Sequence, residues 1–332
     1  MTKISLDLDR LLKEDKISQQ EADHLLSLSD GKKRAGLFAN LFMILGAIAV
    51  STGVLALQPS AIVGLILATA SLGLGYYLFQ IKSEEWRILS HGLIVIGCLG
   101  LAGWTAWQSQ EVWPDKMNWL PQIVALVLFT GGAAFFKQPF LAALVPLAFG
   151  SLIGSGTMYW HASYAIFVRE CLVTIIVFSA IAGGLYYCRE KLHKKWHSVT
   201  TMAARVSFFM INFAFWVGSL WGDYVFELWS SDDGWRAAQA WREQALHVPE
   251  SVFSFAWAIF LGVCIWLGTK DYRRFLANTA VTFLAIHFYT QLFETFGANP
   301  IVLVTSGLTM LGAAFGVTRF DRWQKERIAK TN

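Results

Sequence analysis

The most informative stretch of the chain is 37–57, LFANLFMILGAIAVSTGVLAL, which contains no charged residue and follows directly on Lys32, Lys33 and Arg34. A helix that crosses about 30 Å of hydrocarbon at about 1.5 Å per residue needs roughly 20 apolar residues. The stretch has that length, so it predicts a transmembrane helix. It lacks the short apolar core and small-residue cleavage site of a signal peptide, so we expect it to be retained.

Nine further apolar blocks follow, at 60–80, 88–108, 119–136, 139–156, 162–187, 203–221, 251–268, 275–296 and 300–317. Hydrophobic residues make up 55% of the 332-residue chain and charged residues only 15%, against about 25% charged in a typical soluble domain. We therefore predict an all-α fold, a polytopic transmembrane bundle of about ten helices. Blocks 119–136 and 139–156 are separated only by Lys137 and Gln138, so they either cross fully or form one re-entrant hairpin.

The distribution of positive charge predicts the orientation of the bundle. Lysine and arginine stay preferentially on the cytoplasmic side of a membrane. If the amino end lies inside, most of the 27 lysine and arginine residues fall in inner segments. Many of the 15 tryptophans then mark outer helix ends, where their amphipathic rings prefer the membrane boundary. We expect a multi-pass protein of a bacterial cytoplasmic (inner) membrane, with both termini cytoplasmic.

The predicted bundle covers residues 35–318, and three parts of the chain lie outside the membrane. Residues 1–34 predict a cytosolic helical hairpin with a basic linker, because leucines repeat at helical spacing and Ser18 with Glu21 forms a capping box for a second helix. This hairpin docks on its own membrane helices, on a second copy or on a cytosolic partner. The outer loop 222–250 is predicted to hold a short helix after Asp232 or Asp233. Residues 319–332 form a basic cytosolic tail.

Ionisable residues inside hydrocarbon are costly, so they usually face a polar cavity or a partner. Arg169 and Glu170 fall in block 162–187, and Asp223 follows block 203–221. On block 275–296, three polar residues at i, i+4 and i+7 share one helical stripe. We predict that an outward-facing polar cavity is built from these residues, with Arg169 paired to Glu294 and Glu170 bonded to His287. In the alternative interpretation, each is a structural residue whose polar group finds a hydrogen bond or water close by, and no binding cavity is formed. The candidate binding residues are Arg169, Glu170, Asp223, His287, Gln291 and Glu294.

A polybasic run, REKLHKKWH at 189–197, follows the sixth block. Such a cluster attracts anionic lipid headgroups by about 1 kcal/mol for each basic residue near the surface. The run therefore predicts a lipid-facing basic cluster. In the alternative, its positive charges only keep this loop on the cytoplasmic side of the membrane. The residues concerned are Arg189, Lys191, Lys194 and Lys195.

Several functional classes find no support in the sequence. The four cysteines lack the paired spacing of a zinc or redox site, and HExxH, Walker and GxSxG motifs are missing from the sequence. We therefore predict no catalytic residue, no metal and no cofactor. The basic residues are spread over many loops, which disfavours nucleic acid as a partner. Glycines at 97, 100 and 103, and at 312 and 316, are typical of close helix packing.

The run KISQQEA at 16–22, placed before Arg34 and a first span with Leu45, Gly46 and Gly53, resembles bacterial membrane proteins of domain of unknown function 2157. The resemblance covers about the first quarter of the chain, and it implies a membrane location rather than an activity. Two functions remain: a small-solute transporter, or a non-transporting scaffold or sensor that acts through the hairpin or the outer loop. A membrane-embedded enzyme comes third. The expected partners are the lipid bilayer and either further copies of the chain or another membrane protein.

Overall fold

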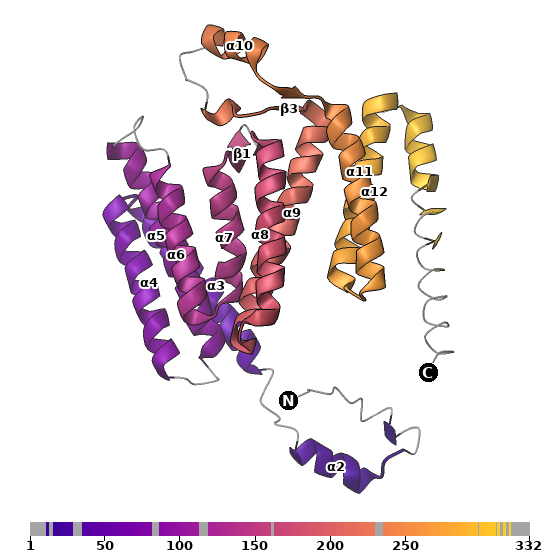
Figure 1. The fold of residues 1–332 in the computed structure, drawn as a ribbon. Coiled ribbons are helices and arrows are strands. Elements are labelled where there is room, and N and C mark those ends of the chain that lie inside the picture. Colours follow the sequence, from indigo (N-terminus) through magenta and orange to yellow (C-terminus); the bar gives the residue numbers. More distant parts are fainter. Residues whose placement is uncertain are drawn as a thin grey trace. The chain divides into compact units, whose positions relative to one another are not determined.

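The computed structural model describes residues 11–12, 16–28, 35–81, 86–112, 119–160, 163–229, 235–297, 299–309, 311–312, 315–316 and 319. These residues are mainly helical, and the predicted fold class is confirmed to that extent (Figure 1). The strands among the described residues form two short antiparallel pairs. The chain divides into two compact units, Met1–Trp113 and Pro114–Asn332.

The first unit contains α2 (Gln19–Leu28), α3 (Ala35–Leu57), α4 (Ala61–Ile81) and α5 (Arg87–Val112). The predicted capping box is confirmed at the start of α2. The Glu21 carboxylate accepts the Ser18 backbone N–H at 2.9 Å, and the Ser18 hydroxyl accepts the Glu21 N–H at 3.2 Å. These two bonds satisfy backbone donors that the first turn of a helix leaves unpaired.

Glycines allow α4 and α5 to approach closely, as the sequence predicted for the third block. A Cβ on Gly97 would lie 2.7 Å from the backbone nitrogen of Leu72, and one on Gly100 would lie 2.8 Å from the Cβ of Ala68. The Ser90 hydroxyl crosses the same interface and donates to the Gly75 carbonyl at 2.8 Å. Gly103, Gly312 and Gly316 have no atom of the described residues within 4 Å of such a Cβ, so close packing at these three is not observed.

The second unit begins with α6 (Leu120–Phe136) and α7 (Pro139–Leu152), followed by the hairpin of β1 (Ser155–Trp160) and β2 (Ser163–Val168). Next come α8 (Cys171–Lys191), the 3-10 turn η1 (Lys194–Trp196) and α9 (His197–Trp221). A loop region then contains β3 (Asp223–Tyr224), η2 (Glu227–Trp229), α10 (Trp235–Gln244) and β4 (His247–Val248). It leads to α11 (Glu250–Lys270), α12 (Arg274–Phe296) and a shorter apolar helix, Pro300–Thr309.

Helix α9 is the centre of the second unit. It contacts α7, α8, α11 and α12, and its side chains form the largest single share of a buried aromatic and aliphatic core. Trp257 on α11 is fully buried there, and its indole N–H donates to the Asn212 side chain at 3.1 Å. The Asn212 amide in turn donates to the Phe208 carbonyl at 2.8 Å. This bond lets a polar residue sit inside the apolar core without an unpaired amide nitrogen.

The sequence prediction of a helical block at 162–187 is wrong at its amino end. Residues Ser155–Trp160 pair with Ser163–Val168 in an antiparallel hairpin, and the helix begins only at Cys171. The hairpin lacks charged residues and is rich in aromatic and β-branched residues, which favour extended backbone. A short apolar run of this kind cannot be assigned to helix or strand by hydrophobicity alone. In contrast, the short helix predicted after Asp232 or Asp233 is confirmed as α10.

Five helices in the described part of the chain are long and apolar enough to cross a membrane: Ala61–Ile81, Arg87–Val112, Cys171–Arg189, Lys194–Trp221 and Glu250–Lys270. The predicted count of about ten spans is therefore not confirmed. Several other apolar helices are shorter, and α7 has only 14 residues, about 21 Å of helix. Large apolar side chains are exposed on many helices, among them Phe42, Ile62, Phe255 and Ile259. Such surfaces are compatible with a membrane protein, whose solvent is lipid.

Candidate functional site

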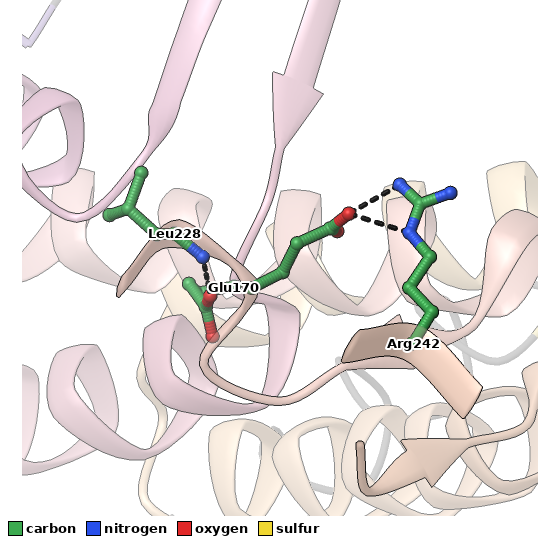
Figure 2. A network of polar contacts seen from close by, with 4 residues as sticks. Glu170, Leu228 and Arg242 are labelled. Carbon is green, nitrogen blue, oxygen red and sulfur yellow. Dashed lines mark hydrogen bonds and ion pairs between the residues drawn. The ribbon is translucent and has the colours of Figure 1, made fainter. Parts of the chain in front are cut away.

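Glu170 is the residue that joins the β1–β2 hairpin to α8, and its side chain is fully buried. Its carboxylate accepts the backbone N–H of Phe226 at 2.8 Å and that of Leu228 at 2.7 Å. Figure 2 shows the second of these bonds, next to the ion pair of Arg242. One carboxylate thus fixes the loop after β3, including Phe226, whose φ of 69° is unusual for a residue with a side chain.

Asp223 makes the reverse connection, from the loop region to the start of α8. Its side chain is 3% exposed, and one of its oxygens accepts the backbone N–H of Leu172 at 2.7 Å. The first amides of a helix have no partner within the helix, and a negative charge there is favourable. Asp223 therefore caps α8 from a distant part of the sequence, because the carboxylate of Glu170 is engaged elsewhere. We call Glu170, Asp223 and the amides of Leu172, Phe226 and Leu228 the carboxylate clamp.

The clamp holds two carboxyl groups away from water. Burial raises the pKa of Glu170 above its ordinary value, although the amides of Leu228 and Phe226 oppose the shift. Burial likewise raises the pKa of Asp223, against the amides of Leu172 and Cys171. In both cases the loss of hydration outweighs the gain from the backbone donors. The clamp therefore binds protons more readily than two exposed carboxyl groups would.

An ion pair lies next to the clamp. The Arg242 side chain on α10 donates through both Nε and an outer nitrogen to one oxygen of Glu227, with Nε at 2.8 Å. The same guanidinium lies over the Tyr224 ring, 5.5 Å from its centroid. The Arg242 and Glu227 side chains are 46% and 28% exposed, so this pair contributes at most about 1 kcal/mol to stability. Its role is to position α10 over the loop rather than to stabilise the fold.

Two cavities adjoin at this end of the second unit, and Phe167, Val168 and Arg169 line both. The larger, of about 930 Å³, is hereafter the Arg169 cavity. The smaller, of about 390 Å³, reaches the clamp and the ion pair. Arg169 is exposed, and its backbone N–H donates to the Gly154 carbonyl at 3.1 Å. The Arg169 cavity is further lined by Trp119, by Leu228 of η2 and by residues of α6, α7, β1 and α9, including Gln122, Ser151, Ser155, Met210 and Phe213.

The polar groups around the Arg169 cavity are not paired with one another. Within the part of the chain that the structure describes, the Arg169 guanidinium forms no ion pair or hydrogen bond. The Gln122 amide oxygen and the Ser155 hydroxyl are buried and have no partner among the described residues. Asp223 Oδ1, in the smaller cavity, is also without one. Buried polar atoms are nearly always hydrogen-bonded, so this group of atoms is suited to bind water or a solute.

The α12 stripe, His287, Gln291 and Glu294, does not line either cavity. His287 lies against the Trp257 ring edge, with centroids 4.8 Å apart, and its Nδ1 has no partner among the described residues. Gln291 Nε2 is likewise buried and unpartnered within them, whereas Glu294 is exposed. The predicted bond from Glu170 to His287 is wrong, because backbone amides occupy the Glu170 carboxylate. The predicted pairing of Arg169 with Glu294 is not observed.

The predicted basic cluster divides over the end of α8 and the following turn. The Arg189 guanidinium lies 5.8 Å from the Tyr186 ring centroid, and Lys191 Nζ lies 4.4 Å from that of Tyr187. Lys194 and Lys195 belong to η1, and both are exposed. Their exposed amines are available to headgroups, and contact with lipid stays a prediction.

Sequence reasoning found Arg169, Glu170 and Asp223 but missed Gln122, Ser155, Glu227 and Arg242. Gln122 carries a signal, since it is an isolated amide within an apolar block. Ser155 carries none, because a serine inside a span usually bonds the preceding helical turn. The backbone amides of the clamp could not be predicted, because nearly every residue has an amide and the sequence distinguishes residues only by their side chains.

No family model, curated protein or solved structure matches the chain. The resemblance to domain of unknown function 2157 therefore stays a prediction. Among the described residues there is also no group of three histidine, cysteine, aspartate or glutamate side chains placed to hold a metal ion. The geometry of the Arg169 cavity is therefore the strongest indication of function in this chain.

Proposed function

We propose that this chain is a membrane transporter that binds a small anionic solute in the Arg169 cavity. One observation carries the proposal: Gln122 of α6, Ser155 of β1 and Arg169 after β2 line one cavity, and their side-chain polar groups have no partner among the described residues. These residues come from three different elements. Their packing brings the three side chains to one cavity without hydrogen bonds between them. The apolar helices that surround this cavity are compatible with a membrane location.

The chemistry of the three groups indicates the class of solute. The planar guanidinium of Arg169 matches a carboxylate or phosphate with two parallel hydrogen bonds. The Gln122 amide oxygen can only accept, so it calls for a hydroxyl or amine donor on the solute. The Ser155 hydroxyl can do either. A cavity of about 930 Å³ lies in the range typical of small-molecule sites, about 300 to 1,000 Å³. A hydroxylated or aminated small acid fits this arrangement.

Binding can be measured on the purified full-length chain in detergent. A panel of small hydroxy acids, amino acids and sugar phosphates is screened for an increase in the midpoint of thermal unfolding. We expect at least one acid to raise it in the wild-type protein and not in Arg169→Gln. Arg319→Gln, which removes an exposed arginine outside both cavities, is the matched control and should respond like the wild type. If no anion in the panel stabilises the protein, or Arg169→Gln still responds, the binding proposal is wrong.

Transport is tested with the solute that binds, in proteoliposomes that hold the wild type or Arg169→Gln. Solute flux above protein-free liposomes, lost in Arg169→Gln, is the expected result. Binding without flux would contradict transport and favour a sensor. The specific observation behind that second candidate is the clamp, which ties the loop region after β3 to α8 beside the smaller cavity. A solute that contacts Arg169 could therefore change the position of α10.

A further inference from the structure

A second charged cavity lies in the same unit, and it is independent of the proposed transport function. It has a volume of about 590 Å³ and is bounded by the last turns of α8, the first half of α9 and the turn between α11 and α12. Four arginines line it: Arg189, Arg205, Arg273 and Arg274. We call it the arginine pocket.

The arginine pocket has an excess of positive charge. Asp271 pairs with Arg273 at 3.2 Å. Among the described side chains, which do not include that of Glu190, no carboxylate lies within ion-pair distance of Arg189, Arg205 or Arg274. Unlike a surface lysine, which carries its charge on a mobile stem, each arginine presents a planar fork that fits phosphate oxygens. The pocket is therefore suited to an anion with several oxygens.

Aromatic rings hold two of the guanidiniums in place. Arg205 lies over the Phe275 ring, 4.5 Å from its centroid, and Arg273 lies over the Tyr186 ring at 4.4 Å. In such stacking the ring contacts the flat face of the guanidinium, while the N–H groups at its edge stay free to donate. The donors are thus arranged before any ligand binds, which lowers the entropic cost of binding.

Apart from Thr200, Thr201 and two tyrosines, the remainder of the pocket lining is apolar, and it is open along α8. Its lining includes Ala182, Gly183, Ala204 and Phe208. A Cβ on Gly183 would meet no atom of the described residues within 4 Å, so the surface of α8 is open there. A soluble anion would gain nothing from this apolar surface. A phospholipid would gain from both parts, since its phosphate meets the arginines and its acyl chain lies on α8.

We propose that the arginine pocket binds the phosphate group of an anionic phospholipid. The site differs from the basic cluster predicted from the sequence, since Arg189 alone belongs to both. Lys191, Lys194 and Lys195 do not line the pocket. General attraction of a polybasic segment to a charged membrane would depend on those lysines, whereas a defined site depends on Arg205 and Arg274. This difference provides the test.

The experiment is native mass spectrometry of the full-length protein in detergent, titrated with phosphatidylglycerol and, separately, with phosphatidylcholine. We expect the wild type to retain phosphatidylglycerol preferentially. Arg205→Gln with Arg274→Gln should weaken its apparent affinity about tenfold or more. Lys194→Gln with Lys195→Gln removes the same number of charges beside the pocket and should leave the affinity unchanged. Since Arg205 also stacks on Phe275, Arg205→Lys with Arg274→Lys serves as a milder variant and should show an intermediate loss.

Three results would overturn the proposal. The first is equal binding of the two lipids by the wild type. The second is an equal loss in the arginine and lysine double variants, which would indicate general electrostatic attraction. The third is displacement of phosphatidylglycerol by millimolar inorganic phosphate, which would make a soluble phosphate the ligand. A folded arginine variant, shown by an unchanged elution profile in size-exclusion chromatography, is required for the comparison. If the Arg205→Gln, Arg274→Gln variant does not fold, the Arg205→Lys, Arg274→Lys variant decides by the same criteria.

Discussion

The carboxylate clamp and the α12 stripe both contain polar side chains that are unusual next to apolar blocks, but these side chains differ in their hydrogen-bond partners. In the clamp, Glu170 and Asp223 accept backbone N–H groups from segments more than 50 residues away. In the stripe, His287 and Gln291 each keep a buried nitrogen without a partner among the described residues. The clamp connects elements of the chain, whereas the stripe lies inside a helix packed against α9 and α11.

The difference shows that the position of a polar residue relative to helix ends decides what it can bond. Amides inside a helix are already paired, so a side chain in mid-helix must find a side chain from another element. Amides at helix ends and in loops are free and can be reached by a nearby carboxylate. Glu170 and Asp223 lie at such ends, and His287 does not. Substitutions in the clamp and in the stripe should therefore differ in their effect on stability.

The largest effect is expected for Glu170→Ala. The substitution removes the acceptor of the part-buried Phe226 and Leu228 amides, which should cost about 3 kcal/mol of folding free energy. The measurement is the midpoint of thermal or denaturant unfolding in detergent. Glu294→Ala, which removes an exposed glutamate of the α12 stripe, is the matched control and should change the midpoint little. A similar loss in both variants would show that the clamp has no special role.

Asp223→Ala should have the next largest effect. It removes an acceptor from the first turn of α8, and the loss of a helix cap costs about 1 to 2 kcal/mol. Asp223→Asn keeps an acceptor but removes the charge, and we expect it to retain about half of the stabilisation. Hydrogen exchange at the Leu172 amide provides a local readout. Unchanged exchange there in Asp223→Ala would contradict the capping role.

The pH dependence of stability should be smaller and opposite to that of an ordinary salt-bridged carboxylate. Burial raises the pKa values of Glu170 and Asp223 in the folded state above their ordinary 4.5 and 3.8. Between the ordinary and the raised values the folded chain binds more protons than the unfolded chain, so its stability falls as the pH rises through this window. Unfolding midpoints measured from pH 4 upward should show this fall in the wild type. Glu170→Gln with Asp223→Asn should flatten it, and an unchanged slope would contradict the assignment.

The smallest effect, and one of opposite sign, is expected for Gln291→Met. Gln291 Nε2 is buried without a partner among the described residues, so a side chain of similar length without polar atoms removes a cost rather than a bond. We expect the free energy of unfolding, measured from the unfolding midpoint, to stay the same or to rise by at most about 1 kcal/mol. A clear loss of stability would show that Gln291 forms a bond that matters, and the contrast with the clamp would then fail.

Much of the fold could be predicted from particular residues, and the exceptions have physical causes. The capping box of Ser18 and Glu21 is local, so its geometry follows from spacing of three residues. The packing of Gly97 on Leu72 also follows from the lack of a side chain. The β1–β2 hairpin was missed because apolar strands and apolar spans share a composition. The number of spans depends on helix length, which composition alone does not give, and the predicted count of about ten is not confirmed.

The candidate site was predicted in part. The sequence identified Arg169, Glu170 and Asp223 because charges near apolar blocks are rare. It assigned Glu170 the wrong partner, because it considered only other side chains. The Glu170 carboxylate bonds the amides of Phe226 and Leu228, and amides occur at every residue except proline. Gln122 and Ser155 join the cavity through tertiary packing of α6 and β1, which no local pattern records.

The central claim is that the Arg169 cavity is open to solutes, whereas the unpartnered nitrogen atoms of His287 and Gln291 on α12 are buried. The direct measurement is thiol labelling in a variant whose four cysteines, Cys98, Cys171, Cys188 and Cys264, are replaced by alanine. Arg169→Cys, at an exposed position that lines both cavities, and Gln291→Cys are then treated separately with a charged, water-soluble methanethiosulfonate in open membrane sheets. We expect Arg169→Cys to react at least about tenfold faster than Gln291→Cys. Equal rates, or an inert Arg169→Cys, would contradict the account.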